Sequence, residues 1–350
     1  MPSELEGTQR GIDKTLLIWV IDPGGQIEFR KVELAAVLSS PASDHVQRED
    51  AAQPACITTQ PACNGLKFYN YVRRASYAGE EDTRRMLYGV LIKPIADLLP
   101  RDPDQLVTFV PYGPFNLVPF AALEDPDGHW LIERHSIALA PSVASLERIP
   151  RGHEAEPATR RNALVAGIGE FKGNQPLPNA EHEAREVARM LGAEPVLGDR
   201  ATKQLILSRL PEADIVDIAT HASYTPSTDE NVLYLADGEQ LTADDVAKLH
   251  LKASIVVLSA CQSAGGNVTA EGMVGLARAF LTAGARQVLV AMWGVNDEVA
   301  PIFVGSFYEA YLRTGSATRA VRSAMLTIAR NPVYRDPQYW AEFELFGAPD

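Results

Sequence analysis

Hydrophobic and polar residues follow two rhythms along the second half of the chain. Short apolar runs of strand length occur at 163–168, 214–220, 254–260 and 287–291, with a shorter run at 232–235. The segments between them have apolar residues at helical spacing, which is typical of a mostly parallel sheet with crossover helices. The predicted fold class is therefore α/β. Helices are predicted at 179–191, 202–210, 242–249, 271–283, 296–313 and 317–330, with Asn179, Thr242 and Asn296 as N-caps.

The first half of the chain is less regular. Two runs of strand length, 15–21 and 27–32, flank the turn Asp22-Pro-Gly-Gly25, which predicts a β-hairpin. Further predicted elements are a helix at 80–99, strands at 106–110 and 131–140, and a last strand at 343–346 that closes the edge of the sheet.

Three stretches without periodicity divide the chain. Residues 1–14 are polar and are predicted to be a disordered N-terminus, and 39–65 carries prolines and no repeat, as expected of a long loop. A charged, proline-containing stretch follows at residues 150–161. It is the predicted boundary between an N-terminal subdomain, 15–150, and a second subdomain, 151–350.

The composition excludes several classes of protein. The chain has 350 residues, of which 46% are hydrophobic and 22% charged, and this is enough for a sizeable core. A net charge of -13 gives no electrostatic support for nucleic-acid binding. No apolar run reaches membrane-spanning length and no signal pattern opens the sequence, so we expect a cytoplasmic protein without membrane contact. Cys56 and Cys63 have no metal-ligand spacing around them, so no metal or cofactor is expected.

Two of the predicted strands end in residues that can carry chemistry. The run at 214–220 is followed by His221, and the run at 254–260 delivers Cys261 before Gly265 and Gly266. A thiol needs a base or a positive neighbour to become a thiolate near neutral pH, and imidazole can be either. A lone cysteine or histidine at such a position is usually structural. Two matched strand ends in this order predict a Cys-His dyad.

The blocks that end in His221 and Cys261 resemble the caspase-like cysteine peptidases, in which the histidine lies some tens of residues upstream of the cysteine. Over residues 15–347 the chain is more closely similar to the CHAT-domain peptidases, a separase-related branch found largely in bacteria. The resemblance is carried by 91–95, 110–113, 118–123, 140–142, Ala219-Thr-His-Ala222, Leu258-Ser-Ala-Cys-Gln262, 271–280, 283–285, Met292-Trp-Gly-Val-Asn-Asp297 and 340–347.

The resemblance implies a fold and a catalytic arrangement. It implies a caspase-like, mostly parallel sheet flanked by helices in 151–350, and a pseudo-caspase-like α/β subdomain before it. Cys261 would be the nucleophile, and His221 would activate the thiol or protonate the leaving amine. The backbone N–H groups of Cys261 and Ala222 would form the oxyanion hole. Ala222 stands where the family usually has glycine, and a positive φ there would cost alanine about 1 kcal/mol or more.

Four further residues are candidates for binding substrate. By resemblance to separase-like enzymes, Asp297 would select a basic residue before the cut, and Glu271, Gln262 and Ser263 would contact the substrate. Asp297 and Glu271 also fit as acids in the first turns of helices, where the helix dipole favours them. Asp217 is expected to be a solvated strand-end acid or a structural hydrogen-bond acceptor, too far back on its strand to orient His221.

These observations favour a cysteine endopeptidase that cleaves a partner protein, in a bacterial defence or regulated-proteolysis system. The resemblance implies a protein substrate, such as a gasdermin-like pore former, and a helical-repeat or regulatory partner. The alternative is a catalytically silent CHAT scaffold that binds a peptide or protein. A nucleotide-binding protein is disfavoured because Gly167, Gly169 and Gly173 do not have the Gly-x-Gly-x-x-Gly spacing.

Overall fold

A computed structural model describes residues 15–34, 81–112, 115–116, 118–148, 162–171, 176–225, 230–262 and 270–348. The predicted disordered N-terminus, the predicted loop at 39–65 and the predicted boundary at 150–161 lie outside these residues, so all three stay predictions. No helix in the described ranges is both long and apolar enough to cross a membrane.

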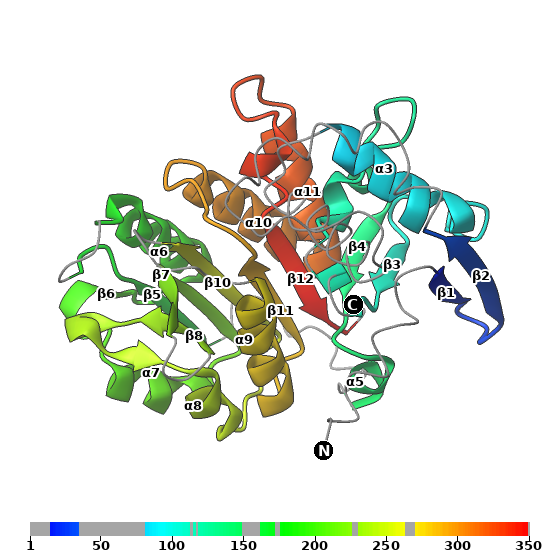
Figure 1. The fold of residues 1–350 in the computed structure, drawn as a ribbon. Coiled ribbons are helices and arrows are strands. Elements are labelled where there is room, and N and C mark those ends of the chain that lie inside the picture. Colours follow the sequence, from blue (N-terminus) through cyan, green and yellow to red (C-terminus); the bar gives the residue numbers. More distant parts are fainter. Residues whose placement is uncertain are drawn as a thin grey trace, which may run out of the picture.

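In the described part of the chain, ten strands form one sheet (Figure 1). Its main path runs β3-β4-β12-β11-β10-β7-β5-β6, and β8 and β9 branch from β7. Neighbouring strands are mostly parallel, as the alternation of strands and helices predicts. The strands are β3 Leu106–Phe109, β4 Ser136–Leu139, β5 Ala163–Gly167, β6 Val196–Leu197, β7 Ile215–Thr225, β8 Glu230–Tyr234, β9 Gln240–Leu241, β10 Ile255–Gln262, β11 Gln287–Ala291 and β12 Phe343–Gly347.

Helices cover both faces of this sheet. In Figure 1, α6, α10 and α11 lie on one side of it and α7, α8 and α9 on the other, with α6 packed on β5, β7 and α10. The helices are α3 Glu81–Leu91, α4 Leu131–Arg134, α5 Val143–Arg148, α6 Pro178–Leu191, α7 Lys203–Arg209, α8 Ala243–Ala247, α9 Ala270–Ala283, α10 Ala300–Thr314 and α11 Ala317–Ala329. The predicted α/β class, a mostly parallel sheet flanked by helices, is confirmed.

The last strand was predicted to close the edge of the sheet, and this prediction is wrong. β12 lies between β4 and β11, parallel to β4 and antiparallel to β11. All five of its residues are buried, because helices cover the sheet here and a strand lies on each side. β12 therefore joins strands from the first half of the chain to those of the second. A short apolar run predicts a strand but does not determine its neighbours.

Three local predictions also need correction. Residues 131–140 form a short helix, α4, followed by β4, because the Glu133 carboxylate accepts a hydrogen bond from the Trp130 amide and closes a helical turn. Asn179 is not an N-cap, since α6 begins at Pro178 with Leu177 in the cap position. Asn296 lies four residues before α10, and its Oδ1 accepts a bond from the Glu298 amide in a separate turn.

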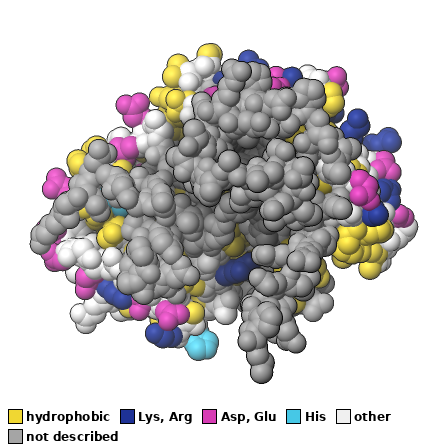
Figure 2. Space-filling view, viewed as in Figure 1, with side chains coloured by type: hydrophobic (Ala, Val, Ile, Leu, Met, Phe, Trp, Pro, Cys, Tyr) yellow, Lys and Arg dark blue, Asp and Glu magenta, His cyan; other side chains and the backbone are white. Residues whose placement is uncertain are grey.

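The predicted hairpin is confirmed as a separate two-stranded sheet. β1 Thr15–Ile21 pairs with β2 Ile27–Glu33, and an ion pair of 3.4 Å joins Arg30 to Asp97. One face of the hairpin is apolar and exposed, and Figure 2 shows yellow side chains gathered where β1 and β2 lie in Figure 1. We call this the hairpin face; its residues are Leu17, Trp19, Ile21, Ile27 and Phe29, which are 44–62% exposed.

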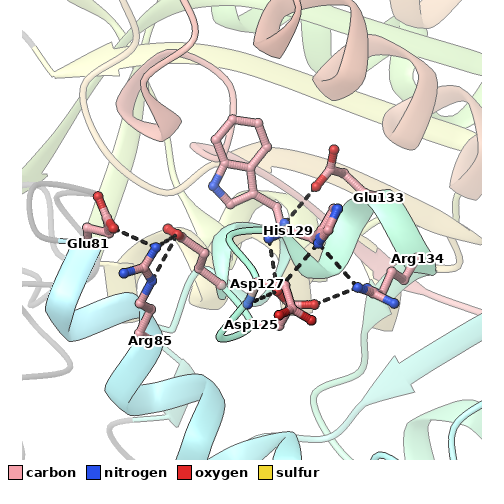
Figure 3. Close-up of polar contacts among 9 residues, drawn as sticks. Glu81, Arg85, Asp125, Asp127, His129, Glu133 and Arg134 are labelled. Carbon is pink, nitrogen blue, oxygen red and sulfur yellow. Dashed lines mark hydrogen bonds and ion pairs between the residues drawn. The ribbon is translucent and has the colours of Figure 1, made fainter.

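An ion-pair network fixes α3 against the segment that precedes α4 (Figure 3). Arg85 donates through Nε and Nη2 to the buried Glu124 carboxylate at 3.0 and 2.7 Å. Arg134 donates to Asp125 at 2.7 Å. Burial alone would raise the pKa of Asp125, but the His129 amide, Arg134 and the Asp127 amide together hold it below its usual value. The network belongs to the first half of the chain, away from the two strand-end residues.

Gly167 determines how closely α6 approaches the sheet. A Cβ at this position would lie 2.6 Å from the Ala180 carbonyl oxygen and 2.7 Å from the Ala184 Cβ, both on α6. Only a glycine lets β5 and α6 pack at this distance without displacing backbone. The spacing matters for the site, because α6 also carries Asn179 and Glu183.

We expect Gly167→Ala to lower the free energy of unfolding by about 1–3 kcal/mol, because the added methyl overpacks the contact. Gly89→Ala is the matched control, since Gly89 is an exposed position of α3 with nothing within 4 Å of the added Cβ. That change should raise stability by up to about 1 kcal/mol through helix propensity. Urea unfolding of both variants measures the difference. Equal effects would mean that Gly167 does not set the spacing.

Candidate active site

His221 and Cys261 are register partners on two adjacent parallel strands. β7 pairs with β10 in a register that matches Ile255 with Ile215 and ends with Cys261 opposite His221. Adjacent strands lie about 4.8 Å apart, so the two backbones are direct neighbours. Both strands continue one or more residues past these positions, which places the pair within the sheet rather than just beyond it. For Cys261 and Gln262 the structure describes the backbone. The catalytic roles of the pair remain predictions.

Aromatic packing orients the ring of His221. The residue is 2% exposed, and its ring centroid lies 4.4 Å from that of Phe171, with the planes tilted by 48°. Phe171 also packs against Tyr234, whose carbonyl accepts a 2.6 Å bond from the Thr220 hydroxyl. From the sequence alone, the stretch around Phe171 is interpreted only as a glycine loop. An aromatic residue shortly after Gly169 was the available signal for this contact.

Ala222 has ordinary backbone geometry. Among the residues that the structure describes, Asp237 is the one non-glycine with a positive φ, so Ala222 avoids that region. Ala222 continues β7, opposite Leu233 of β8 and Gln262 of β10. The alanine therefore carries no backbone strain, although the family usually has glycine there. Its amide as an oxyanion donor remains a prediction.

A small hollow lies two residues back along both strands from the positions of His221 and Cys261. Ala219 and Ser259 form part of its wall, each two residues before the dyad position on its strand, which is about 6.6 Å along a strand. Helix α6 and the start of α10 form the other walls. The complete lining is Leu177, Asn179, Ala180, Glu183, Ala219, Ser259, Asp297, Ala300 and Pro301.

Two hydrogen bonds organise the polar side of this hollow. The Asn179 Nδ2 donates to Asp297 Oδ2 at 2.9 Å, and the Ser259 hydroxyl donates to Glu183 Oε2 at 3.2 Å. Asp297, predicted to bind substrate, thus lies in a wall shared with α6. Glu183 and Asn179 were not predicted as site residues. Their spacing of four along a helix was a weak signal, because such a pair usually belongs to a solvated helix face.

A second carboxyl group lies behind the hollow. Asp217 is fully buried, because α6 and α10 cover its face of the sheet, so the expectation of a solvated acid was wrong. Burial raises the pKa of Asp217 to about 7, and the nearby Tyr308 hydroxyl opposes that rise. Burial also raises the pKa of Glu183 well above its usual value, and the charges of Asp217 and Asp297 add to the rise.

The other predicted substrate contacts are less defined. Gln262 is the last residue of β10 and Glu271 lies in the first turn of α9, each described by its backbone, while Ser263 falls outside the described residues. Their roles stay predictions. Within the described ranges, no three His, Cys, Asp or Glu side chains are grouped so as to hold a metal ion.

The chain matches the model of a known family. The family model of the CHAT domain matches residues 81–348, well over half of the chain. The chain therefore belongs to the CHAT domain family, and the resemblance seen in the sequence is confirmed.

Two curated relatives are much longer than this chain. Tetratricopeptide repeat protein 28 of Homo sapiens is 31% identical over 332 residues, and its Mus musculus counterpart is 32% identical over 320. The alignments cover 79% and 75% of this chain. In both cases the chain spans only 13% of the relative.

Solved structures show a looser likeness. The Saccharomyces cerevisiae separase–securin complex aligns with a TM-score of 0.46 and 15% identity, over 69% of this chain and 16% of that one. The Arg-specific cysteine proteinase gingipain R aligns with a TM-score of 0.47 and 10% identity, over 82% and 75%. Likenesses at these TM-scores carry no information about chemistry.

Asp217 should make the protein less stable as the pH rises. Its folded pKa of about 7 exceeds the usual 3.8, so the folded state holds more protons between these values. Stability contributed by protonated Asp217 is therefore complete below about pH 4 and is lost as the pH rises through 7, by at most about 4 kcal/mol. We expect Asp217→Asn to flatten this decline in urea unfolding between pH 4 and 8.

The difference between wild type and Asp217→Asn isolates this group from other buried acids, such as Glu342, whose pKa burial also raises. Parallel pH profiles for the two proteins would show that Asp217 ionises in the folded state as readily as in the unfolded chain.

Proposed function

We propose that this protein is a cysteine endopeptidase that cleaves a partner protein, with Cys261 as nucleophile and His221 as its acid-base partner. The observation that carries the proposal is the register of β7 and β10, which sets residue 261 directly opposite residue 221. Membership of the CHAT family supports it. A setting in bacterial defence stays a prediction, and the curated relatives matched by the chain are mammalian.

The proposed reaction needs two proton transfers. The imidazole of His221 takes the thiol proton of Cys261, and the thiolate attacks the scissile carbonyl carbon. The resulting oxyanion accepts hydrogen bonds from the amides of Cys261 and Ala222. The imidazolium then gives its proton to the departing amine, and water hydrolyses the acyl-enzyme. Phe171, which packs on the His221 ring, is expected to hold the imidazole in place for both transfers.

We propose further that the hollow binds a basic side chain of the substrate, at the residue before the cut. Asp297 and Glu183 supply carboxyl groups, while Leu177, Ala219 and Pro301 supply apolar wall for the methylene stem. A guanidinium or ammonium group would exchange its hydration for these carboxyl oxygens, a charge-assisted contact. Glu271, Gln262 and Ser263 remain proposed contacts to the substrate backbone.

The alternative is a catalytically silent scaffold that binds a peptide in the same place. One observation favours it: His221 is 2% exposed, and a general base must reach its substrate. The two functions differ in one measurable property. An active dyad reacts with a peptide electrophile through Cys261, whereas a scaffold binds the peptide and leaves the thiol unmodified.

We expect the purified protein to cleave library peptides after arginine or lysine. Cys261→Ala should lower the rate by at least about a thousandfold, because no other group replaces the nucleophile. Cys56→Ala is the matched control, since the sequence places that thiol in the predicted loop 39–65. Cleavage that persists in Cys261→Ala would overturn the nucleophile. A wild-type protein that neither cleaves nor reacts with a peptide electrophile would favour the scaffold.

For the partner, we propose that the hairpin face binds a helical-repeat surface. The curated relatives are tetratricopeptide repeat proteins, of which this chain spans 13%, and such repeats are stacked helix pairs. A two-stranded sheet is marginally stable alone, and Trp19 and Phe29 leave an apolar surface on it, with ring centroids 5.4 Å apart. An amphipathic helix buries such a surface.

The repeat region of the human relative, made separately, is the probe for this surface. We expect it to bind wild type, and the double change Trp19→Ser with Phe29→Ser to weaken binding at least about tenfold, since aromatic anchors dominate such contacts. Val333→Ser, which alters an exposed apolar residue elsewhere, is the control. Binding unaffected by the double change, or absent from wild type, would contradict the proposed surface.

A further inference from the structure

Two buried carboxyl groups stand at the inner end of the hollow. Glu183 comes from α6 and lines the hollow, and Asp217 comes from β7 and lies behind it. They are 2% and 0% exposed. We call them the buried carboxyl pair. The pair is linked electrostatically, because the charge of Asp217 raises the pKa of Glu183.

The elements packed around the pair contribute polar groups, and among the described residues no lysine or arginine influences the pKa of either carboxyl. β10 supplies the Ser259 hydroxyl, α10 supplies the Tyr308 hydroxyl, and the segment before α10 supplies the Asp297 carboxylate. Burial raises the pKa of the Tyr308 hydroxyl, and Tyr311, further along α10, adds to that rise. Within the described part of the chain, Glu183 Oε1 and both Asp217 oxygens have no hydrogen-bond partner of regular geometry.

Two ionised carboxylates in this setting would be costly. Burial penalises each charge, and each charge penalises the other, so two such groups share protons and titrate together. The pKa of Asp217, raised to about 7 by burial, and the pKa of Glu183, which burial and the charge of Asp217 raise well above its usual value, agree with this. Near neutral pH we therefore expect the pair to retain a proton while no cation is bound. A protonated Glu183 attracts a cation poorly.

We propose that a guanidinium or ammonium group entering the hollow expels a proton from the buried carboxyl pair, so that recognition of a basic side chain is coupled to proton release. The proposal rests on the proposed function, which places a basic side chain in this hollow. Glu183 supplies the contact, because the residue lines the hollow and its buried Oε1 has no hydrogen-bond partner among the described residues. Asp217 does not line the hollow, so it acts by setting the charge of Glu183.

The exchange is balanced in charge. The substrate cation keeps its own protons, because its pKa lies well above neutral, about 10.4 for lysine and higher for arginine. Glu183 loses one proton to solvent, past Asp297 and Asn179 at the rim, and its carboxylate then accepts a hydrogen bond from the substrate. One positive charge enters and one leaves. The apolar walls and the sheet behind them thus never surround an uncompensated second carboxylate.

This coupling has a definite sign. The deprotonated pair binds the cation, so affinity rises with pH until the pair is already ionised in the free protein, and is constant above that. One proton released corresponds to a change in the dissociation constant of about tenfold per pH unit below that point.

Isothermal titration calorimetry on Cys261→Ala tests the proposal without cleavage. The probes are a hexapeptide with arginine before the cut and the same peptide with norleucine, titrated in phosphate and in Tris between pH 6 and 8. The heat difference between buffers counts protons. We expect about one proton released with arginine near pH 7, and none with norleucine.

Three isosteric changes assign the effect, each checked for folding by thermal unfolding. Glu183→Gln should abolish proton release and the pH slope. Asp217→Asn should move the slope to lower pH, because Glu183 then ionises more easily. Asp297→Asn should weaken arginine binding but leave the number of protons released unchanged.

Arginine binding without proton release, or equal binding of the two peptides, would overturn the proposal. A merely structural role of the pair would change stability and leave the proton count unaltered. Cleavage is a separate readout: proton-coupled arginine binding in a protein that never cleaves would refute the endopeptidase and retain this inference. An active endopeptidase that releases no proton on binding arginine would refute this inference and support the proposed endopeptidase function.

Discussion

The parallel pairing of β7 with β10 is the constraint on which the site depends. Hydrogen bonds between adjacent strands set the register residue by residue, and a slip of one position would turn each side chain to the other face. The register is secured by buried residues on both strands, including Ile215, Val216, Ile255 and Val256, rather than by the site itself. The hydrophobic core thus holds residues 221 and 261 opposite each other.

The sheet face that carries Asp217 and Ser259 combines a packed core with polar groups of the site. Helices α6 and α10 cover it, and the close approach of α6 at Gly167 brings Glu183 to Ser259. The same cover removes water from Asp217 and Tyr308. Burying acids without a cation nearby lowers stability as they ionise, so a structure that retains them has a stability that depends on pH. A site that takes up a basic group would relieve that cost when occupied.

Strands from both halves of the chain belong to one sheet. β12, near the end of the sequence, pairs with β4 from the first half and β11 from the second, and its Phe343 stacks on Phe303 of α10 at 4.1 Å. The main sheet is therefore continuous through the described residues, whereas the hairpin stands beside it as a second sheet. The hairpin face is apolar and exposed, and the chain spans 13% of its curated relatives. A partner outside this fold is therefore the expected cover for that face.

The class of fold, the family and the positions of most strands and helices can be predicted from the amino-acid sequence. These follow from local pattern: apolar runs such as 255–258, caps such as Thr242 and the glycine after α9 act within a few residues. The same pattern singled out His221 and Cys261 as candidates. Only the tertiary structure decided which strands are neighbours, that Asp217 is buried, and that Asn179 meets Asp297. Those outcomes depend on how α6 and α10 pack against the sheet, which joins residues more than a hundred positions apart, and no local rule of spacing contains that information.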